Sequence, residues 1–242
     1  MKLKLATHTV IGYPNLKTSE KIVSVLAQHS QIIELQIPFS DPVADGPVIA
    51  AANSVALQNK ITPQICLNFV TKISQKFPQT NFYLMTYFNP VFRFGITKFA
   101  KAAQKAGVAG FIIPDLPVEE ATEFLKICRQ NKLHLIFVVA PNTPDERLKL
   151  ISQKSSNWIY AAARLGITGS MSDFGSELKK FLTRIHQFSK AEIGVGFGVK
   201  NSADLKKIQL AGGQIGIVGS ELFRQFEKGG LKKLERFLKS LN

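Results

Sequence analysis

The sequence has only two cysteines, Cys66 and Cys128, and no apolar run that approaches the length of a membrane span. The two cysteines match no metal-binding spacing, and such sparse use of cysteine is typical of proteins whose thiols stay reduced. A membrane-spanning helix needs about 18 to 20 apolar residues, and the start, MKLKLATHTV, is too short and too interrupted for a signal peptide. We therefore expect a cytoplasmic protein without a metal centre.

Acidic residues are also scarce, since 17 Asp and Glu stand against 31 Lys and Arg, and the net charge is +14. This surplus raises the possibility of nucleic-acid binding. The lysines, however, are scattered along helical segments such as residues 177–187, and no nucleic-acid motif or alternation of aromatic and basic residues is present. Solvated helix faces explain the charge better.

Short β-branched and aromatic runs recur along the chain, each followed by a longer segment of helical periodicity. We predict strands at residues 3–11, 32–37, 81–87, 110–113, 133–139, 158–162, 192–197 and 215–218. We predict helices at residues 19–28, 47–58, 63–76, 96–106, 118–130, 145–153, 174–188, 202–210 and 220–241. Thr62 is placed to cap the helix that begins with Pro63. The acids that open the helix predicted from Val118 suit its dipole.

Strand and helix alternate eight times, with one extra helix after the second strand. This rhythm predicts a parallel sheet, and eight units predict a closed (β/α)₈ TIM barrel. An open doubly wound sheet is the alternative, but no G-x-G-x-x-G follows the first strand. No linker or shift in composition divides the chain, so we expect residues 1–242 to form one domain.

Two carboxylates near the second strand are candidates for chemistry. Glu34 stands inside an apolar strand, where an ionised carboxylate is costly unless it is paired or protonated. Asp45 lies in the loop that follows, at the strand ends where barrel active sites form. Two carboxylates in different surroundings can divide proton donation and acceptance. The alternatives are a structural ion pair for Glu34 and a helix cap for Asp45.

Glycines at the last two strand ends indicate a phosphate site. GFG (196–198) ends the seventh strand, and Gly219 and Ser220 lie between the eighth strand and a helix. Backbone N–H groups of glycines and of a helix start bind anions, and the loops after strands seven and eight commonly hold phosphate in this fold. The alternative is that these glycines only form tight turns.

The motifs resemble those of the tryptophan synthase α subunit family, from about Leu5 to the end of the chain. The most specific is ELQIPFSDPVADGP (34–47), and MTYFNP, PDLPVEE, YAAARLGITG, GFG and VGS follow in order. The resemblance implies a (β/α)₈ enzyme that cleaves indole-3-glycerol phosphate to indole and glyceraldehyde 3-phosphate, without metal or organic cofactor. It also implies a pyridoxal-phosphate β subunit as partner, in an αββα heterotetramer.

The resemblance also assigns roles to individual residues. Glu34 would protonate the indole ring and help to remove the glycerol hydroxyl proton, while Asp45 would interact with the indole N–H. Thr168 would bond to Asp45 when the loop 164–170 closes over the substrate. The expected substrate-binding residues are Tyr87, Ile112, Tyr160, Thr168, Gly169, Phe197, Gly198, Gly219 and Ser220.

The chain departs from the family's pattern in three places. Few residues precede the first strand, so the family's N-terminal helix is expected to be shortened or absent. His8 replaces an aromatic or aliphatic residue that usually touches indole, and we interpret it as a hydrogen-bonded histidine at the pocket edge. Gln36 replaces a glycine on the same side of the strand as Glu34, where it can hydrogen-bond the carboxylate.

Overall fold

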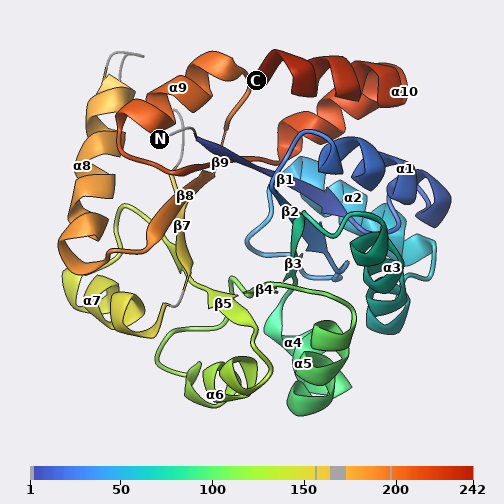
Figure 1. The fold of residues 1–242 in the computed structure, drawn as a ribbon, viewed down its shortest axis with the longest axis horizontal. Helices are drawn as coiled ribbons and strands as arrows, with labels where there is room; N and C mark the ends of the chain where they lie inside the picture. Colours follow the sequence, from blue (N-terminus) through green and yellow to red (C-terminus); the bar gives the residue numbers. More distant parts are fainter. Residues whose placement is uncertain (1–2, 156, 164–172, 197, 242) are drawn as a thin grey trace.

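Parallel strands form a ring that is surrounded by helices (Figure 1). The computed structural model describes residues 3–155, 157–163, 173–196 and 198–241. Its strands are β1 (Lys4–Val10), β2 (Ile32–Gln36), β3 (Asn81–Met85), β4 (Gly110–Ile112), β5 (His134–Ile136), β6 (Val138–Val139), β7 (Trp158–Ala162), β8 (Glu192–Gly196) and β9 (Ile215–Val218). They follow the order β5-β4-β3-β2-β1-β9-β8-β7-β6. Because only Phe137 separates β5 from β6, these two strands share one position and close the ring, which confirms the predicted (β/α)₈ barrel.

Helices cover the outer face of the ring in Figure 1. They are α1 (Leu16–Ala27), α2 (Pro47–Gln58), α3 (Pro63–Lys76), α4 (Phe88–Phe94), α5 (Ile96–Lys105), α6 (Thr122–Gln130), α7 (Asp145–Lys154), α8 (Asp173–Phe188), α9 (Ser202–Leu210) and α10 (Ser220–Leu241). Thr62 caps α3 as predicted, since its side chain accepts from the Ile65 N–H. No helix precedes β1 among the described residues. None of the described helices has both the length and the apolar character needed to cross a membrane.

Alternation along the strands separates the two faces of the barrel wall. On β2, Ile33 and Leu35 pack into the large core between strands and helices. Ile32 instead joins a second cluster, in which residues such as Tyr83 and Trp158 fill the barrel interior. Since side chains two apart share a face of a strand, Glu34 and Gln36 lie on the same side as Ile32.

Two glycines of β8 make room for aromatic rings inside the barrel. A Cβ atom at Gly194 would lie 2.8 Å from the Trp158 ring, and one at Gly196 would lie 2.4 Å from the Tyr160 hydroxyl. Real Cβ atoms do not approach so closely, so any other residue at these two positions would force the Trp158 or Tyr160 ring to shift. The rings of Trp158 and Tyr160 therefore occupy the space that β8 leaves open.

Some predicted boundaries are wrong. The predicted strand 133–139 is interrupted at Phe137, and α6 begins at Thr122 instead of Val118, because residues 117–120 form a turn closed by the Glu120 N–H and the Pro117 carbonyl. Glu123 is therefore the only acidic residue in the first turn of α6. The short helix α4 was not predicted at all.

The predicted last helix has the observed ends, but it bends inside. Gly229 and Gly230 have non-helical backbone angles within α10, and Gly230 has a φ of 62°. This left-handed region favours glycine. The glycine pair therefore divides α10 into two helical segments.

Candidate active site

Glu34 lies beside His8, which belongs to the neighbouring strand. The register of β1 and β2 places His8 opposite Glu34, and 3.1 Å separates His8 Nδ1 from Glu34 Oε2. Only 3% of the His8 side chain and 1% of the Glu34 side chain are exposed. Glu34 is thus paired, as the ion-pair alternative expected, but through one oxygen only. Its other oxygen, Oε1, is buried without a hydrogen-bond partner among the described residues.

Gln36 connects His8 to the second carboxylate. The Gln36 Oε1 atom lies 2.8 Å from His8 Nε2, and Gln36 Nε2 donates to Asp45 Oδ2 over 2.7 Å. A hydrogen-bonded chain therefore runs from Glu34 through His8 and Gln36 to Asp45. The prediction that Gln36 hydrogen-bonds Glu34 is wrong, because its amide is engaged by the other two groups.

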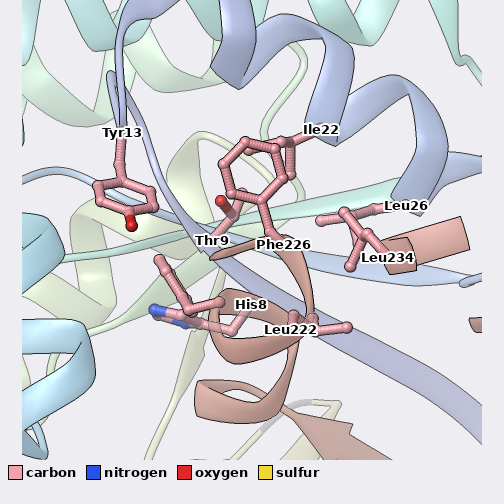
Figure 2. Close-up of a pocket in the computed structure, with 9 residues that line it drawn as sticks. His8, Thr9, Tyr13, Ile22, Leu26, Leu222, Phe226 and Leu234 are labelled. Atoms are coloured by element: carbon pink, nitrogen blue, oxygen red, sulfur yellow. The ribbon is translucent and has the colours of Figure 1, made fainter. Parts of the chain in front are cut away.

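The surroundings of His8 favour its protonated form. Burial works to lower the pKa of His8, but the hydrogen bond and charge of Glu34, with smaller contributions from Asp45 and Gln36, outweigh burial and raise the pKa above its ordinary value. His8 also borders a cavity of about 10 Å³ between β1, α1 and α10, where mostly apolar side chains such as Leu222 surround it (Figure 2). Such a wall does not compete for the imidazole nitrogens.

The loop between β2 and α2 holds Asp45 at the site. The Tyr87 hydroxyl donates to Asp45 Oδ2 over 3.0 Å and accepts from the Ala44 N–H over 3.0 Å. Burial, followed by the charge of Asp45, raises the pKa of Tyr87, so this hydroxyl keeps its proton. The alternative that Asp45 caps α2 is wrong, because the N-cap of α2 is Gly46 and no side chain caps this helix. The structure thus gives Tyr87 a role in positioning Asp45.

Two further polar residues, which sequence reasoning missed, fix the loops of the site. Asn53 is buried in α2, and its side chain accepts from the Phe39 N–H over 3.1 Å and donates to the Ile49 carbonyl over 2.9 Å. The Asp115 carboxylate, in the PDLP motif, accepts from the Phe88 N–H at 2.9 and 3.1 Å and so caps α4. A polar residue among the alanines of α2 was the available signal for Asn53.

Apolar and aromatic side chains fill the barrel interior near Glu34 and Asp45. Ile112 is fully buried, and it belongs with Tyr160, Met85 and Val138 to the interior cluster. Burial, followed by the charges of Glu34 and Asp45, holds the pKa of Tyr160 well above its usual range. Tyr160 therefore stays protonated beside the two carboxylates.

The glycines of the expected phosphate site lie at the ends of β8 and β9. Gly198 follows β8 with a φ of 88°, and Gly219 directly precedes Ser220, the first residue of α10. Gly198 adopts a left-handed backbone conformation that glycine tolerates. The first N–H groups of α10 have no partner within the helix and point outward from its start. Thr168, Gly169 and Phe197, also expected here, lie outside the described residues.

A closed parallel barrel with one buried carboxylate on β2 and a second in the loop that follows this strand is the arrangement of a (β/α)₈ enzyme that works by acid–base chemistry. The family model described as Tryptophan synthase alpha chain matches residues 2–241. A tryptophan synthase alpha chain of Syntrophotalea carbinolica is 40% identical over 238 residues, which are 98% of this chain and 93% of that relative. One of Methanocaldococcus jannaschii is 41% identical over 232 residues, or 93% and 82% of the two chains.

A solved structure gives the same assignment from the fold. A chain from the tryptophan synthase a2b2 complex of Pyrococcus furiosus superposes with a TM-score of 0.91 at 30% identity, and the match covers 99% of both chains. The chain described here belongs to the tryptophan synthase alpha chain family.

Proposed function

We propose that Glu34 and Asp45 perform the acid–base chemistry of the alpha reaction in this chain. The chain is a carbon–carbon lyase of tryptophan biosynthesis, and its family cleaves indole-3-glycerol phosphate to indole and glyceraldehyde 3-phosphate. Glu34 gives a proton to the indole carbon that bears the glycerol side chain, and it accepts the proton of the glycerol hydroxyl. Asp45 bonds to the indole N–H and balances the positive charge of the protonated ring. This ring then accepts the electrons of the breaking carbon–carbon bond.

The unpartnered oxygen of Glu34 is the observation that supports this assignment most directly. A buried polar atom without a partner costs about 1–3 kcal/mol, and proteins rarely tolerate this cost without a functional reason. Glu34 Oε1 is such an atom among the described residues, whereas Oε2 is held by His8. One oxygen is thus fixed and the other is left for the substrate.

The remaining site residues receive binding roles in this proposal. Ile112 and Tyr160, with Met85 and Val138, would line the slot for the indole ring, and Tyr87 would hold Asp45 against it. Backbone groups at Gly169, Phe197, Gly198 and Gly219, together with Ser220, would bind the phosphate. Closure of the loop that carries Thr168 would exclude water from the reaction.

A tryptophan synthase β subunit is the partner of this chain, in an αββα heterotetramer like the a2b2 complex of Pyrococcus furiosus. We propose that the loop before α2 contributes to the docking face. Asp41 is exposed and Val43 is 74% exposed, while Asp45 in the same loop contacts Gln36 and Tyr87. One short segment therefore connects the outer surface with the candidate carboxylate.

The test is to incubate the purified chain with indole-3-glycerol phosphate, with and without the β subunit encoded by the same genome. We expect indole and glyceraldehyde 3-phosphate in equal amounts, formed faster when the β subunit is present. A second candidate function, a weakened scaffold that mainly activates the β subunit, is motivated by His8 and Gln36. It predicts activation of the β reaction but negligible indole formation under both conditions.

We also propose that the protein is cytoplasmic and that residues 1–242 act as one domain. Cys66 and Cys128 are free and buried, which fits a reducing compartment. Strands from Lys4 to Val218 share one sheet, which supports a single folding unit. Limited proteolysis tests the second proposal, because a single domain yields no stable fragment made of half the barrel.

A further inference from the structure

We propose that His8 and Gln36 are positioning residues for the proton that Glu34 uses. In this proposal His8 shares one proton with Glu34, and Gln36 fixes the imidazole by tying it to Asp45. The inference rests on the proposed acid–base role of Glu34, and it concerns two positions at which the chain departs from its family's pattern. Three hydrogen bonds connect Glu34 to His8, His8 to Gln36 and Gln36 to Asp45.

The amide of Gln36 determines which nitrogen of His8 carries a hydrogen. An amide donates only through its nitrogen and accepts only through its oxygen. Gln36 Nε2 donates to Asp45, so Oε1 is the atom that meets His8 Nε2. Since Oε1 can only accept, His8 Nε2 must bear a hydrogen. Turning the amide around would place two oxygens 2.7 Å apart with no hydrogen between them.

One proton then remains to be placed between His8 Nδ1 and Glu34 Oε2, which are 3.1 Å apart. Either the imidazolium N–H donates to a carboxylate, or the carboxyl O–H donates to a bare nitrogen. Both arrangements satisfy the two buried atoms, and a short transfer interconverts them. The proton therefore belongs to the Glu34–His8 pair and not to either side chain alone.

This shared proton balances the reaction. Cleavage adds one proton to the indole carbon and removes one from the glycerol hydroxyl, so substrate and products are isomeric overall. The shared proton lies between His8 Nδ1 and Glu34 Oε2, so once it is on Glu34 a half-turn of the carboxyl group places it toward the substrate, where the indole carbon takes it. As the carbon–carbon bond breaks, the hydroxyl becomes a carbonyl and its proton returns to the pair. The pair thus ends the cycle with the proton it started with.

The groups around His8 favour retention of that proton. Those that face the imidazole are Glu34 and Gln36 from β2, Asp45 from the following loop, Phe223 from α10, and Tyr13, which shares the adjoining cavity. The charged groups that act on His8 are Glu34 and Asp45, both negative, and they raise the pKa of His8 despite its burial. The Tyr13 hydroxyl donates to Glu227 instead.

Nitrogen-15 NMR of the complete chain labelled at histidine tests the tautomer without any substrate. The chain has four histidines, and the His8→Gln variant identifies the signals of His8. We expect His8 Nε2 to carry a hydrogen across roughly pH 5 to 8, the range in which free histidine changes charge. The Gln36→Leu variant should release this restriction. A bare Nε2 in the unchanged chain would overturn the inference.

The pH profile of kcat for indole formation tests the shared proton. The His8→Gln variant lacks one of the two groups that hold the shared proton, so the proton is lost more easily and the alkaline limb of the profile should move to lower pH. At about pH 8 this variant should lose at least about tenfold in kcat, less than the roughly 10²–10⁴-fold that a positioned proton transfer contributes, because Glu34 itself remains. The control is His186→Gln, which removes an exposed histidine from α8.

The two measurements separate the two possible failures. If the unchanged chain forms no indole, the proposed function fails, while the NMR result still decides the state of His8. If His8→Gln keeps the kcat and the alkaline limb of the unchanged chain, the inference fails and the lyase assignment stands. A limb that shifts equally in the His186→Gln control would also contradict it.

Discussion

Replacing Glu34 with glutamine should nearly abolish indole formation while the barrel remains folded. Glutamine keeps the shape but has no transferable proton, and positioned proton transfer contributes about 10²–10⁴-fold to rate, or about 2.7–5.4 kcal/mol at 1.36 kcal/mol per tenfold. The free energy of unfolding should fall by much less. The new amide can donate to His8 Nδ1 across the present 3.1 Å contact, so a charge-assisted hydrogen bond becomes a neutral one, at a cost of about 1 kcal/mol.

The assay compares kcat for indole release with the free energy of unfolding in urea. Glu192→Gln is the matched control, because it makes the same substitution at the opposite end of the barrel wall, where Glu192 pairs with Lys4 at 2.7 Å. We expect the control to keep its turnover. Near-normal turnover in Glu34→Gln would refute the proton-transfer role. A loss of rate matched by an equal loss of stability would instead make Glu34 a structural residue.

Asp45→Asn should lower kcat at least about 10²-fold, because a neutral amide cannot balance the charge of a protonated indole ring; unchanged kinetics would remove Asp45 from the mechanism. Gly196→Ala should cost about 1–3 kcal/mol of unfolding free energy, since its Cβ would lie 2.4 Å from the Tyr160 hydroxyl; urea denaturation at an unchanged midpoint would contradict this packing. Gln36→Gly alone should reduce indole formation, because it leaves His8 Nε2 without its acceptor and removes one of the two side-chain donors to Asp45. Adding His8→Phe should cost less than the two single changes summed, and additive losses in kcat/KM would show that the two positions act independently.

Much of the fold could be predicted from the sequence because local chemistry determines it. Pro63 behind Thr62 marks the start of α3, and the alternation of strand and helix predicts the barrel. The errors have physical causes that act across the chain. The helix α4 depends on Asp115, which caps it from another loop, and the turn at residues 117–120 delays α6.

The candidate site could be predicted in its parts but not in its connections. Glu34 and Asp45 are visible as costly or misplaced carboxylates, and period-two alternation correctly puts Gln36 on the side of Glu34. The partner of Gln36 could not be read from the sequence, because it depends on the register that sets His8 opposite Glu34. It depends also on the loop geometry that brings Asp45 within 2.7 Å.

The interruption at Phe137 leaves the ring with shorter strand pairing at β5 and β6 than at β1 and β2. β5 and β6 have 3 and 2 residues, whereas β1 and β2 share a register of five residue pairs. Four steps along the strand order lead from β1 to β5 in one direction and to β6 in the other, so β5 and β6 lie across the ring from β1, which carries His8. Local opening begins where the fewest backbone hydrogen bonds must break. We therefore expect β5 and β6 to open locally before the other strands. New chain ends introduced between them should leave the geometry of Glu34 and His8 unchanged.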